Sequence, residues 1–333
     1  MKKTFSLLFT LLGFCSVFCI SCTKNKSDRN NEVVVYSYDS FVDEWGPGPA
    51  LTELFKEKTG KTLTLVSVGD GANLIRKAIS EKKYPVADVI CGMDNNMLSQ
   101  LINSGIAEAY SSANKTKLFE ELLIDESDTF TPYDYSYFTL IWNSESDLPA
   151  PQSLEDLTKD IYKKKIILMN PKTSTPGLGF VTWAMAVYQD NFESYWERLK
   201  PSILTMAPSW STGYGLFTNG EAPLVCSYTT SPAYHVEYDE TDKFKALIFE
   251  HGHIMQIEGA SLLKAAPNKE GGKEFIDFLT SDEAQAILPK TQWMYPANKN
   301  VQLPECFNAA PKAEKVLPSP SNTAIEKVES LTF

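Results

Sequence analysis

The chain has 333 residues, a formal net charge of −11 and 12% aromatic residues. Nucleic-acid phosphates require a basic protein surface, so a chain this acidic is expected to have no nucleic-acid partner. About 300 residues remain once the N-terminal segment is set aside, which is more than one hydrophobic core comfortably organises, and two lobes are expected.

The N-terminus has the features of a secretion signal. Two lysines precede the apolar stretch Phe5–Ile20, which is too short and too interrupted to span a membrane. It ends in Phe18-Cys-Ile-Ser-Cys22, which resembles the lipobox of bacterial lipoproteins, where the signal is cut before a cysteine that becomes lipidated. The commonest lipobox has Leu where this chain has Cys19, and an ordinary secretory signal cut nearby is the alternative.

We therefore expect residues 1–21 to be a signal peptide, Cys22 to carry the lipid, and the polar segment 22–32 to be a flexible tether. Removing residues 1–21 takes away two lysines and no acids, which leaves a net charge of about −13.

The cysteines and histidines do not form a recognisable metal or disulfide pattern. Outside the signal and Cys22, the cysteines are Cys91, Cys226 and Cys306, and an odd number imposes no disulfide framework. His251 and His253 flank a glycine, but no third ligand is evident. We expect neither a metal site nor a cofactor.

The first part of the chain alternates strands and helices, which is typical of a mostly parallel sheet flanked by helices. Strands are predicted over Glu32–Ser37, Thr62–Val68 and Ala87–Cys91, and helices over Ala50–Thr59, Ala72–Lys82 and Met97–Ser104. Between the first strand and helix, Tyr38–Pro49 is predicted to be a loop, because it is dense in aromatic and helix-breaking residues. Asp70 stands where the N-cap of the next helix would be.

Two long strands are predicted to join the lobes. Thr131–Asn143 alternates aromatic and polar residues and is the expected crossing, with His253–Leu263 as the return. Between these two strands we predict three shorter strands, over Lys164–Met169, over Ile203–Ala207 and from Leu224. The predicted helices start at Ser153 and Thr212 or run over Phe180–Tyr188, Lys269–Leu279 and Asp282–Leu288. Residues 33–140 and 256–333 would then form the first lobe, and residues 141–255 the second.

Aromatic and hydroxyl side chains gather where the predicted strands end. The apolar run at Leu224 leads into Tyr228-Thr-Thr-Ser-Pro-Ala-Tyr234, which offers hydroxyl groups and flat aromatic faces. Asn170–Gly179 could form a cradle for an anion or hydroxyl at a helix start, although it lacks the ending of a phosphate-binding loop. Trp210 is predicted to lie on a loop. Each stretch alone is equally compatible with ordinary turns and caps, but together they predict a cleft for a flat, cationic small molecule.

An ordered set of short motifs resembles the periplasmic thiamine-binding proteins of bacterial ABC transporters. The motifs are Tyr38-Asp-Ser-Phe, Trp45-Gly-Pro-Gly-Pro49, Asp70-Gly71, Ala87-Asp-Val with Gly92 and Asp94-Asn-Asn96, Thr173-Ser-Thr-Pro-Gly-Leu-Gly179, Trp210-Ser211, Tyr214-Gly-Leu-Phe217, Ser227-Tyr-Thr-Thr-Ser-Pro-Ala-Tyr-His235 and Trp293-Met-Tyr-Pro296. The similarity runs from about Val33 to Pro304 with similar spacing. Each motif is weak alone, and the ordered set is specific.

The resemblance implies an α/β, two-lobed type II periplasmic-binding-protein fold that captures thiamine or its phosphates for a membrane permease and its ATPase. It implies that the ligand contacts are Asp70, Gly71, Ser174, Thr175, Trp210, Tyr228, Thr229, Thr230 and Ser231, with Tyr234 and Trp293 as stacking walls and Tyr38 and Trp45 as further binding residues. Familiar members of the family carry a cleaved, soluble signal. The lipobox departs from that pattern and favours a receptor tethered outside the cytoplasm by a lipid on Cys22.

Two other functions remain open on the same fold. Thiaminases of one class are similar to this family and use a cysteine nucleophile, and Cys226 shares a strand face with Tyr228. The simpler interpretation is that Cys226 is a small buried hydrophobe, since no histidine lies in an activating position for it. The remaining alternative is a binder of another cation, such as a polyamine.

Overall fold

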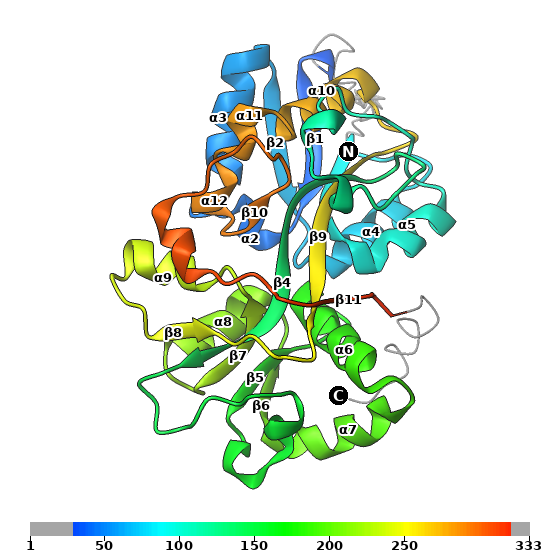
Figure 1. The fold of residues 1–333 in the computed structure, drawn as a ribbon. Coiled ribbons are helices and arrows are strands. Elements are labelled where there is room, and N and C mark those ends of the chain that lie inside the picture. Colours follow the sequence, from blue (N-terminus) through cyan, green and yellow to red (C-terminus); the bar gives the residue numbers. More distant parts are fainter. Residues whose placement is uncertain (1–28, 321–333) are drawn as a thin grey trace, which may run out of the picture.

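In the computed structural model, which describes residues 29–320, eleven strands form one mixed sheet with helices on its faces (Figure 1). The main strand order is β2-β1-β3-β9-β4-β7-β5-β6. The central strands β4 (Thr131–Asn143) and β9 (His253–Leu262) run antiparallel along the length of the molecule. The strands outside them pair in parallel on each side, so two parallel half-sheets share an antiparallel centre.

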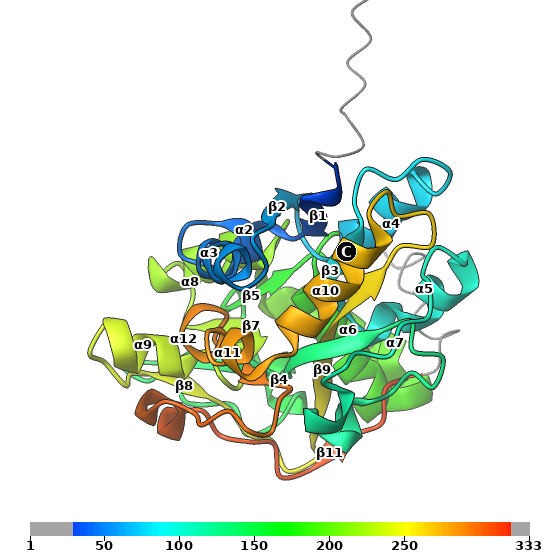
Figure 2. The same cartoon turned by 90° about the horizontal axis from the view of Figure 1, so that it is seen from above.

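The first lobe surrounds β1 (Glu32–Ser37), β2 (Thr62–Ser67) and β3 (Val89–Asp94). Its helices are α2 (Asp39–Val42), α3 (Gly48–Thr59), α4 (Ala72–Ser80), α5 (Leu98–Ser104), α10 (Lys269–Leu279), α11 (Asp282–Gln285) and α12 (Leu288–Thr291). Seen from above, α10 lies over β1 and β9 (Figure 2). A core that includes Val35, Phe55 and Phe275 fills the space between these layers.

The second lobe surrounds β5 (Ile166–Met169), β6 (Ile203–Ala207), β7 (Leu224–Tyr228) and β8 (Phe244–Ala246). Its helices are α6 (Thr175–Tyr188), α7 (Phe192–Leu199), α8 (Trp210–Thr218) and α9 (Pro232–Tyr238). A separate core, which includes Trp183 and Tyr195, packs between α6, α7 and the sheet. The lobes therefore have distinct cores and meet at β4 and β9.

Short elements complete the chain. They are the 3-10 turns at Asn95–Met97, Lys115–Lys117, Glu120–Leu122, Glu155–Thr158, Asp160–Tyr162, Gln189–Asn191, Lys200–Ser202 and Glu305–Ala309, and the strands β10 (Tyr295–Pro296) and β11 (Val316–Leu317). β10 pairs with β4 and β11 pairs with β9, so the last described part of the chain lies against the central strands.

The predicted strands Glu32–Ser37, Thr131–Asn143 and Ile203–Ala207 have the observed bounds, and so does the helix Lys269–Leu279. Runs of β-branched residues and clear helical periodicity made these elements easy to predict. The predicted helix over Asp282–Leu288 is instead two short helices, α11 and α12. The predicted loop Tyr38–Pro49 contains the short helix α2 and the first turn of α3.

The start of α6 was predicted wrongly. The helix begins at Thr175 rather than at Phe180, with Pro176 in its first turn. Glycines in its first turns suggested a loop, but Gly179 faces the ring of Phe138 on β4. An ideal Cβ on Gly179 would lie 2.2 Å from that ring. Close packing of helix against sheet therefore requires glycine here and outweighs its low helix propensity.

Candidate functional site

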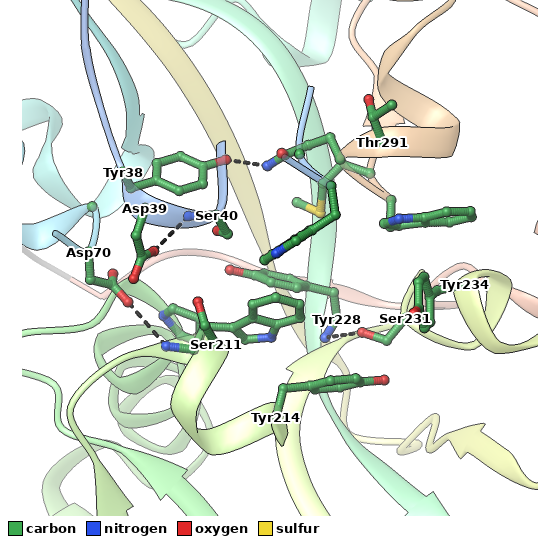
Figure 3. A pocket seen from close by; sticks show the side chains of 18 of the residues that line it. Tyr38, Asp39, Ser40, Asp70, Ser211, Tyr214, Tyr228, Ser231, Tyr234 and Thr291 are labelled. Atoms are coloured by element: carbon green, nitrogen blue, oxygen red, sulfur yellow. Dashed lines mark hydrogen bonds between the residues drawn. The ribbon is translucent and has the colours of Figure 1, made fainter. Parts of the chain in front are cut away.

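A cavity of about 750 Å³ lies between the two lobes. The first lobe contributes the segment around α2, the start of α4 and the loop after α12, and the second contributes the starts of α6 and α8, the end of β7 and helix α9. Figure 3 shows Tyr38 and Asp70 on one side and Tyr214, Tyr228 and Tyr234 on the other. Its size is in the range of small-molecule sites.

Ten of the thirteen predicted binding residues line this cavity. They are Tyr38, Trp45, Asp70, Gly71, Thr175, Trp210, Tyr228, Ser231, Tyr234 and Trp293. These residues are spread over more than 250 positions of the chain, and the fold brings them to one place. The sequence prediction of a shared cleft agrees with that placement.

The other three predicted residues lie behind the wall. Ser174 is fully buried next to Asp70. Thr229 and Thr230 are also fully buried, with their hydroxyls near that of Ser136 on β4, at 3.4 and 3.1 Å. These side chains support the cavity wall from inside the protein and do not line the cavity.

Asp70 bridges the lobes, and its predicted role as an N-cap is wrong. The N-cap residue of α4 is Gly71, and no side chain caps that helix. Instead, Asp70 Oδ1 accepts a hydrogen bond from the Thr175 N–H (3.0 Å), and Oδ2 accepts one from the Trp210 N–H (3.2 Å; Figure 3). These N–H groups begin α6 and α8, so one carboxylate of the first lobe occupies two positive helix ends of the second.

Burial raises the pKa of the Asp70 carboxyl, while the N–H groups of Thr175 and Trp210 and the Ser174 hydroxyl act in the opposite direction. Gly71 makes this close approach possible, because an ideal Cβ there would lie 2.5 Å from Thr175 Oγ1. The Asp70-Gly71 pair therefore makes a close contact between the lobes at this side of the cavity.

Aromatic rings form the second-lobe wall. Trp210 was predicted to lie on a loop, but it is the first residue of α8. The helix begins there because the Ser209 side chain caps it by accepting a hydrogen bond from the Thr212 N–H. Its indole stacks on Tyr214, with centroids 4.9 Å apart, and donates a hydrogen bond to Ser227 Oγ at 2.9 Å. Packing and a hydrogen bond thus fix the Trp210 face toward the cavity.

The rim is a second aromatic cluster that spans both lobes. Tyr234 and Tyr238 lie one turn apart on α9, and each ring meets Trp293 edge-on, at 5.4 and 5.6 Å between centroids. Trp293 has φ 58°, an unusual value for a bulky residue. The neighbouring contacts hold this conformation, which directs the indole across the cleft.

A row of buried carboxyl groups closes the cavity at the centre of the sheet. Asp94 on β3 pairs with Glu258 on β9, and Glu258 pairs with Asp134 on β4. Glu258 lines the cavity, and its Oε2 accepts hydrogen bonds of 2.8 Å from both Tyr38 and Tyr133. Burial raises the pKa of Asp94 and of Glu258 to about 7 each, and raises that of Asp134 strongly.

Several lining residues were not among the predicted binding residues, and they include Tyr214, Tyr238, Gln292 and Glu258. Tyr214 and Gln292 stand within or next to motifs that were recognised. Glu258 had its own signal: it is an acid inside a strand predicted to be buried, and glutamate is rarely buried without a reason.

Cys226 and His253 make contacts inside the fold and do not line the cavity. Cys226 is fully buried, donates weakly to the Pro176 carbonyl at 3.6 Å and is not among the cavity-lining residues. Burial raises the pKa of the Cys226 thiol far above its usual value, which disfavours the reactive thiolate. His253 uses both ring nitrogens on the backbone of Phe249 and Phe138. Among residues 29–320, no group of three or more potential ligands is arranged for a metal ion.

Within the same described range, none of the helices has the length and apolar character needed to cross a membrane. The predicted signal peptide and the lipidation site Cys22 lie outside the described residues.

Three comparisons place the chain among known proteins. A family model described as bacterial extracellular solute-binding protein matches residues 84–323. The thiamine-binding periplasmic protein of Brucella abortus biovar 1 (strain 9-941) is 39% identical over 311 residues, which cover 93% of this chain and 92% of that protein. Its counterpart in Escherichia coli (strain K12) is 36% identical over 297 residues, covering 89% and 90%.

Among solved structures, one described as a periplasmic thiamin binding protein superposes with a TM-score of 0.84 at 35% identity, covering 90% of this chain and 93% of that chain. The fold is therefore that of type II periplasmic binding proteins, a mixed α/β architecture.

Proposed function

The chain belongs to the bacterial extracellular solute-binding protein family, and we propose that it binds thiamine in the cleft between its lobes. It delivers the vitamin to the permease and ATPase subunits of an ABC importer. We take its lobes to be residues 33–140 with 256–333, and residues 141–255, with β11 as an exception because it pairs with His253 and Ile254 of the second lobe. The ligand contacts come from the predicted residues that line the cavity.

The observation that carries this proposal is the make-up of the cavity wall. Thiamine combines a flat aminopyrimidine with a permanently charged thiazolium ring. Trp45, Trp210, Tyr228, Tyr234 and Trp293 supply aromatic faces around one cavity, and Glu258 and Asp70 supply acidic groups. A desolvated aromatic face attracts a cation by about 1–2 kcal/mol. An acidic, aromatic cleft therefore suits a flat cation better than a neutral sugar or an anion.

The hydroxyethyl arm, or a phosphate on it, fits the starts of α6 and α8. The N–H groups in the first turns of these helices have no partner within the helix, and the Ser211 side chain lies at the cavity. Asp70 already accepts from two of these N–H groups, so it shares this region with the arm of the ligand.

A thermal-shift series with thiamine, its monophosphate and its diphosphate tests the proposal, with spermidine as the competing cation. We expect thiamine, and each phosphate form that binds, to raise the melting temperature of the protein by several degrees, because a ligand that binds the folded state stabilises it. A shift with spermidine and none with any thiamine form would assign the cleft to polyamines instead.

We propose further that the protein is a binder and not an enzyme. The buried Cys226 thiol, away from the cavity, is the supporting observation. Incubation with thiamine and a nucleophilic amine, followed by chromatography, should return all of the thiamine intact. Conversion to a pyrimidine–amine product would instead assign a thiaminase activity.

The N-terminal pattern supports a membrane-tethered receptor outside the cytoplasm. The signal is residues 1–21, the lipid is on Cys22, and the tether is 22–32. Mass spectrometry of the mature N-terminus should find a lipidated Cys22. In a Cys22→Ser variant the protein should leave the membrane fraction, whereas unchanged fractionation would contradict the anchor.

A further inference from the structure

The carboxyl row across the centre of the sheet has an arrangement that folding alone does not explain. Asp94, Glu258 and Asp134 occupy paired positions on the adjacent strands β3, β9 and β4. Asp94 and Asp134 are fully buried, and Glu258 is 5% exposed. Burying ionised carboxylates side by side is costly, so the row holds protons at neutral pH or requires a cation beside it.

The surroundings of the row contain no basic partner. Over residues 29–320, no ion pair involves any of its three members. The titratable groups that face Glu258 and Asp134 are acids or weak acids: Tyr38 from the first loop, Asp70 before α4, Cys91 and Asp94 on β3, Tyr133 on β4 and Tyr228 on β7. The basic residue that lines the cavity, Lys290, pairs with Glu237 on α9, so a cation for Glu258 is expected from a molecule in the cavity.

Asp134 differs from the other two members. Asp94 accepts from the Asn96 backbone and side chain, and Glu258 accepts from two tyrosines and from Gln256. Neither Asp134 oxygen has a hydrogen-bond donor among the described residues, and the carboxyl faces Glu258. A fully buried carboxyl without donors that is directed at a second carboxyl is best satisfied by a shared proton.

Glu258 connects this pair to the cavity. It lines the cavity beside Tyr38 and Gln292, and Gln292 Nε2 lies 3.4 Å from its Oε2. The rest of the row is shielded from solvent. A molecule in the cleft therefore meets the row through Glu258.

We propose that Glu258, with its proton-sharing partner Asp134, is the counter-charge for the cation of the ligand, and that binding moves one proton from this pair to solvent. The inference rests on the proposed function, since it takes the ligand to be a thiazolium cation. A fixed positive charge near Glu258 favours the ionised pair, and the displaced proton leaves for the buffer. The thiazolium charge is permanent, its C2–H is far too weak an acid to ionise at pH 7, and the aminopyrimidine is already unprotonated there, so the released proton comes from the protein.

Isothermal titration of the purified protein with thiamine at pH 7, in buffers with different ionisation enthalpies, measures this proton directly. We expect release of about half a proton to one proton per thiamine. Between pH 6 and 8, the apparent Kd should fall by up to about tenfold per pH unit on the acidic side. An uncharged analogue, with a neutral ring in place of thiazolium, should release no proton.

The test variant is Glu258→Gln, which keeps the size of the side chain and an oxygen for the two tyrosines. We expect it to bind thiamine at least tenfold more weakly and to release no proton. Glu193→Gln on the exposed surface of α7 is the matched control and should behave as the wild type. If Glu258→Gln fails to fold, as judged by circular dichroism, Asp134→Asn replaces it and should reduce the proton release by more than half.

The outcomes separate the two proposals. Thiamine binding without proton release in the wild type overturns this inference and leaves the proposed function standing. Unchanged proton release in the folded variant does the same. A titration in which no thiamine form binds overturns the proposed function, and this inference with it.

Discussion

Asp70 joins the two lobes, because its carboxylate accepts hydrogen bonds from the N–H groups of Thr175 and Trp210, 105 and 140 positions away in the chain. Its place before α4 had suggested a local cap instead. The local alternative had a clear rule behind it. The cross-lobe role depends on how two lobes face each other, and no short-range pattern contains that information.

Replacing Asp70 tests this bridge. Asp70→Asn keeps one acceptor oxygen but turns an NH₂ group toward one of the two N–H donors. We expect thiamine affinity to fall by about tenfold, since charge-assisted hydrogen bonds contribute about 1.5–3 kcal/mol. Titration calorimetry measures the change. Asp43→Asn on the exposed surface is the control, and equal affinities in both variants would contradict the bridge.

Tyr228 is the residue on which the second-lobe wall depends most. It lines the cavity at the end of β7, with its ring 5.4 Å from that of Phe138. Tyr228→Ala should weaken thiamine binding by well over 1 kcal/mol, roughly tenfold, while Tyr228→Phe should retain most of the affinity. Fluorescence titration of the two variants gives the comparison. If the Ala variant binds as tightly as the Phe variant, the ring does not contact the ligand.

The raised pKa of Asp94 makes the stability of the folded protein depend on pH. That pKa is raised to about 7 by burial, so the folded state holds this proton more tightly than the unfolded state. Its contribution is fully present below about pH 4 and is lost as the pH rises through about 7. Relative to wild type, Asp94→Asn should therefore gain stability between pH 5 and pH 8, by up to about 2.5 kcal/mol. Urea unfolding at both pH values measures this difference, and a difference that is the same at both would contradict the assignment.

Among the elements, the starts of α4, α6 and α8 meet at a contact between the two lobes. The strands and most helices followed from hydrophobic periodicity, because each is specified by its own residues. The starts of α6 and α8 did not, because glycines and a tryptophan near a strand end suggest a loop until the packing partner is known. The burial of Gly179 against Phe138 supplies that partner only in the folded chain.

Gly71→Ala tests the contact between these elements. The added Cβ would meet Thr175 Oγ1 at 2.5 Å, so the lobes should not close fully. We expect thiamine to reduce the radius of gyration of the wild type in small-angle X-ray scattering, and to reduce it less in the variant. Ser194→Ala on the exposed surface of α7, away from the cavity, is the control. The same ligand-induced compaction in all three proteins would show that closure does not pass through Gly71.

At the scale of the whole molecule, the fold class was predictable and the details of the site were partly so. Alternating strands and helices with two long strands at Thr131 and His253 indicated two lobes, and ten of thirteen predicted site residues line the cavity. Thr229 and Thr230 were misleading, because a hydroxyl at a strand end can turn inward as easily as outward. The carboxyl row was missed because its members come from three separate strands.

A single titration can test whether this cleft binds thiamine. The purified protein is titrated with thiamine while heat and intrinsic tryptophan fluorescence are recorded, since Trp45, Trp210 and Trp293 all line the cavity. We predict saturable binding of one thiamine per chain, with a change in tryptophan emission at the same midpoint. No heat and no change in emission with thiamine, its monophosphate or its diphosphate would show that the cleft does not bind thiamine.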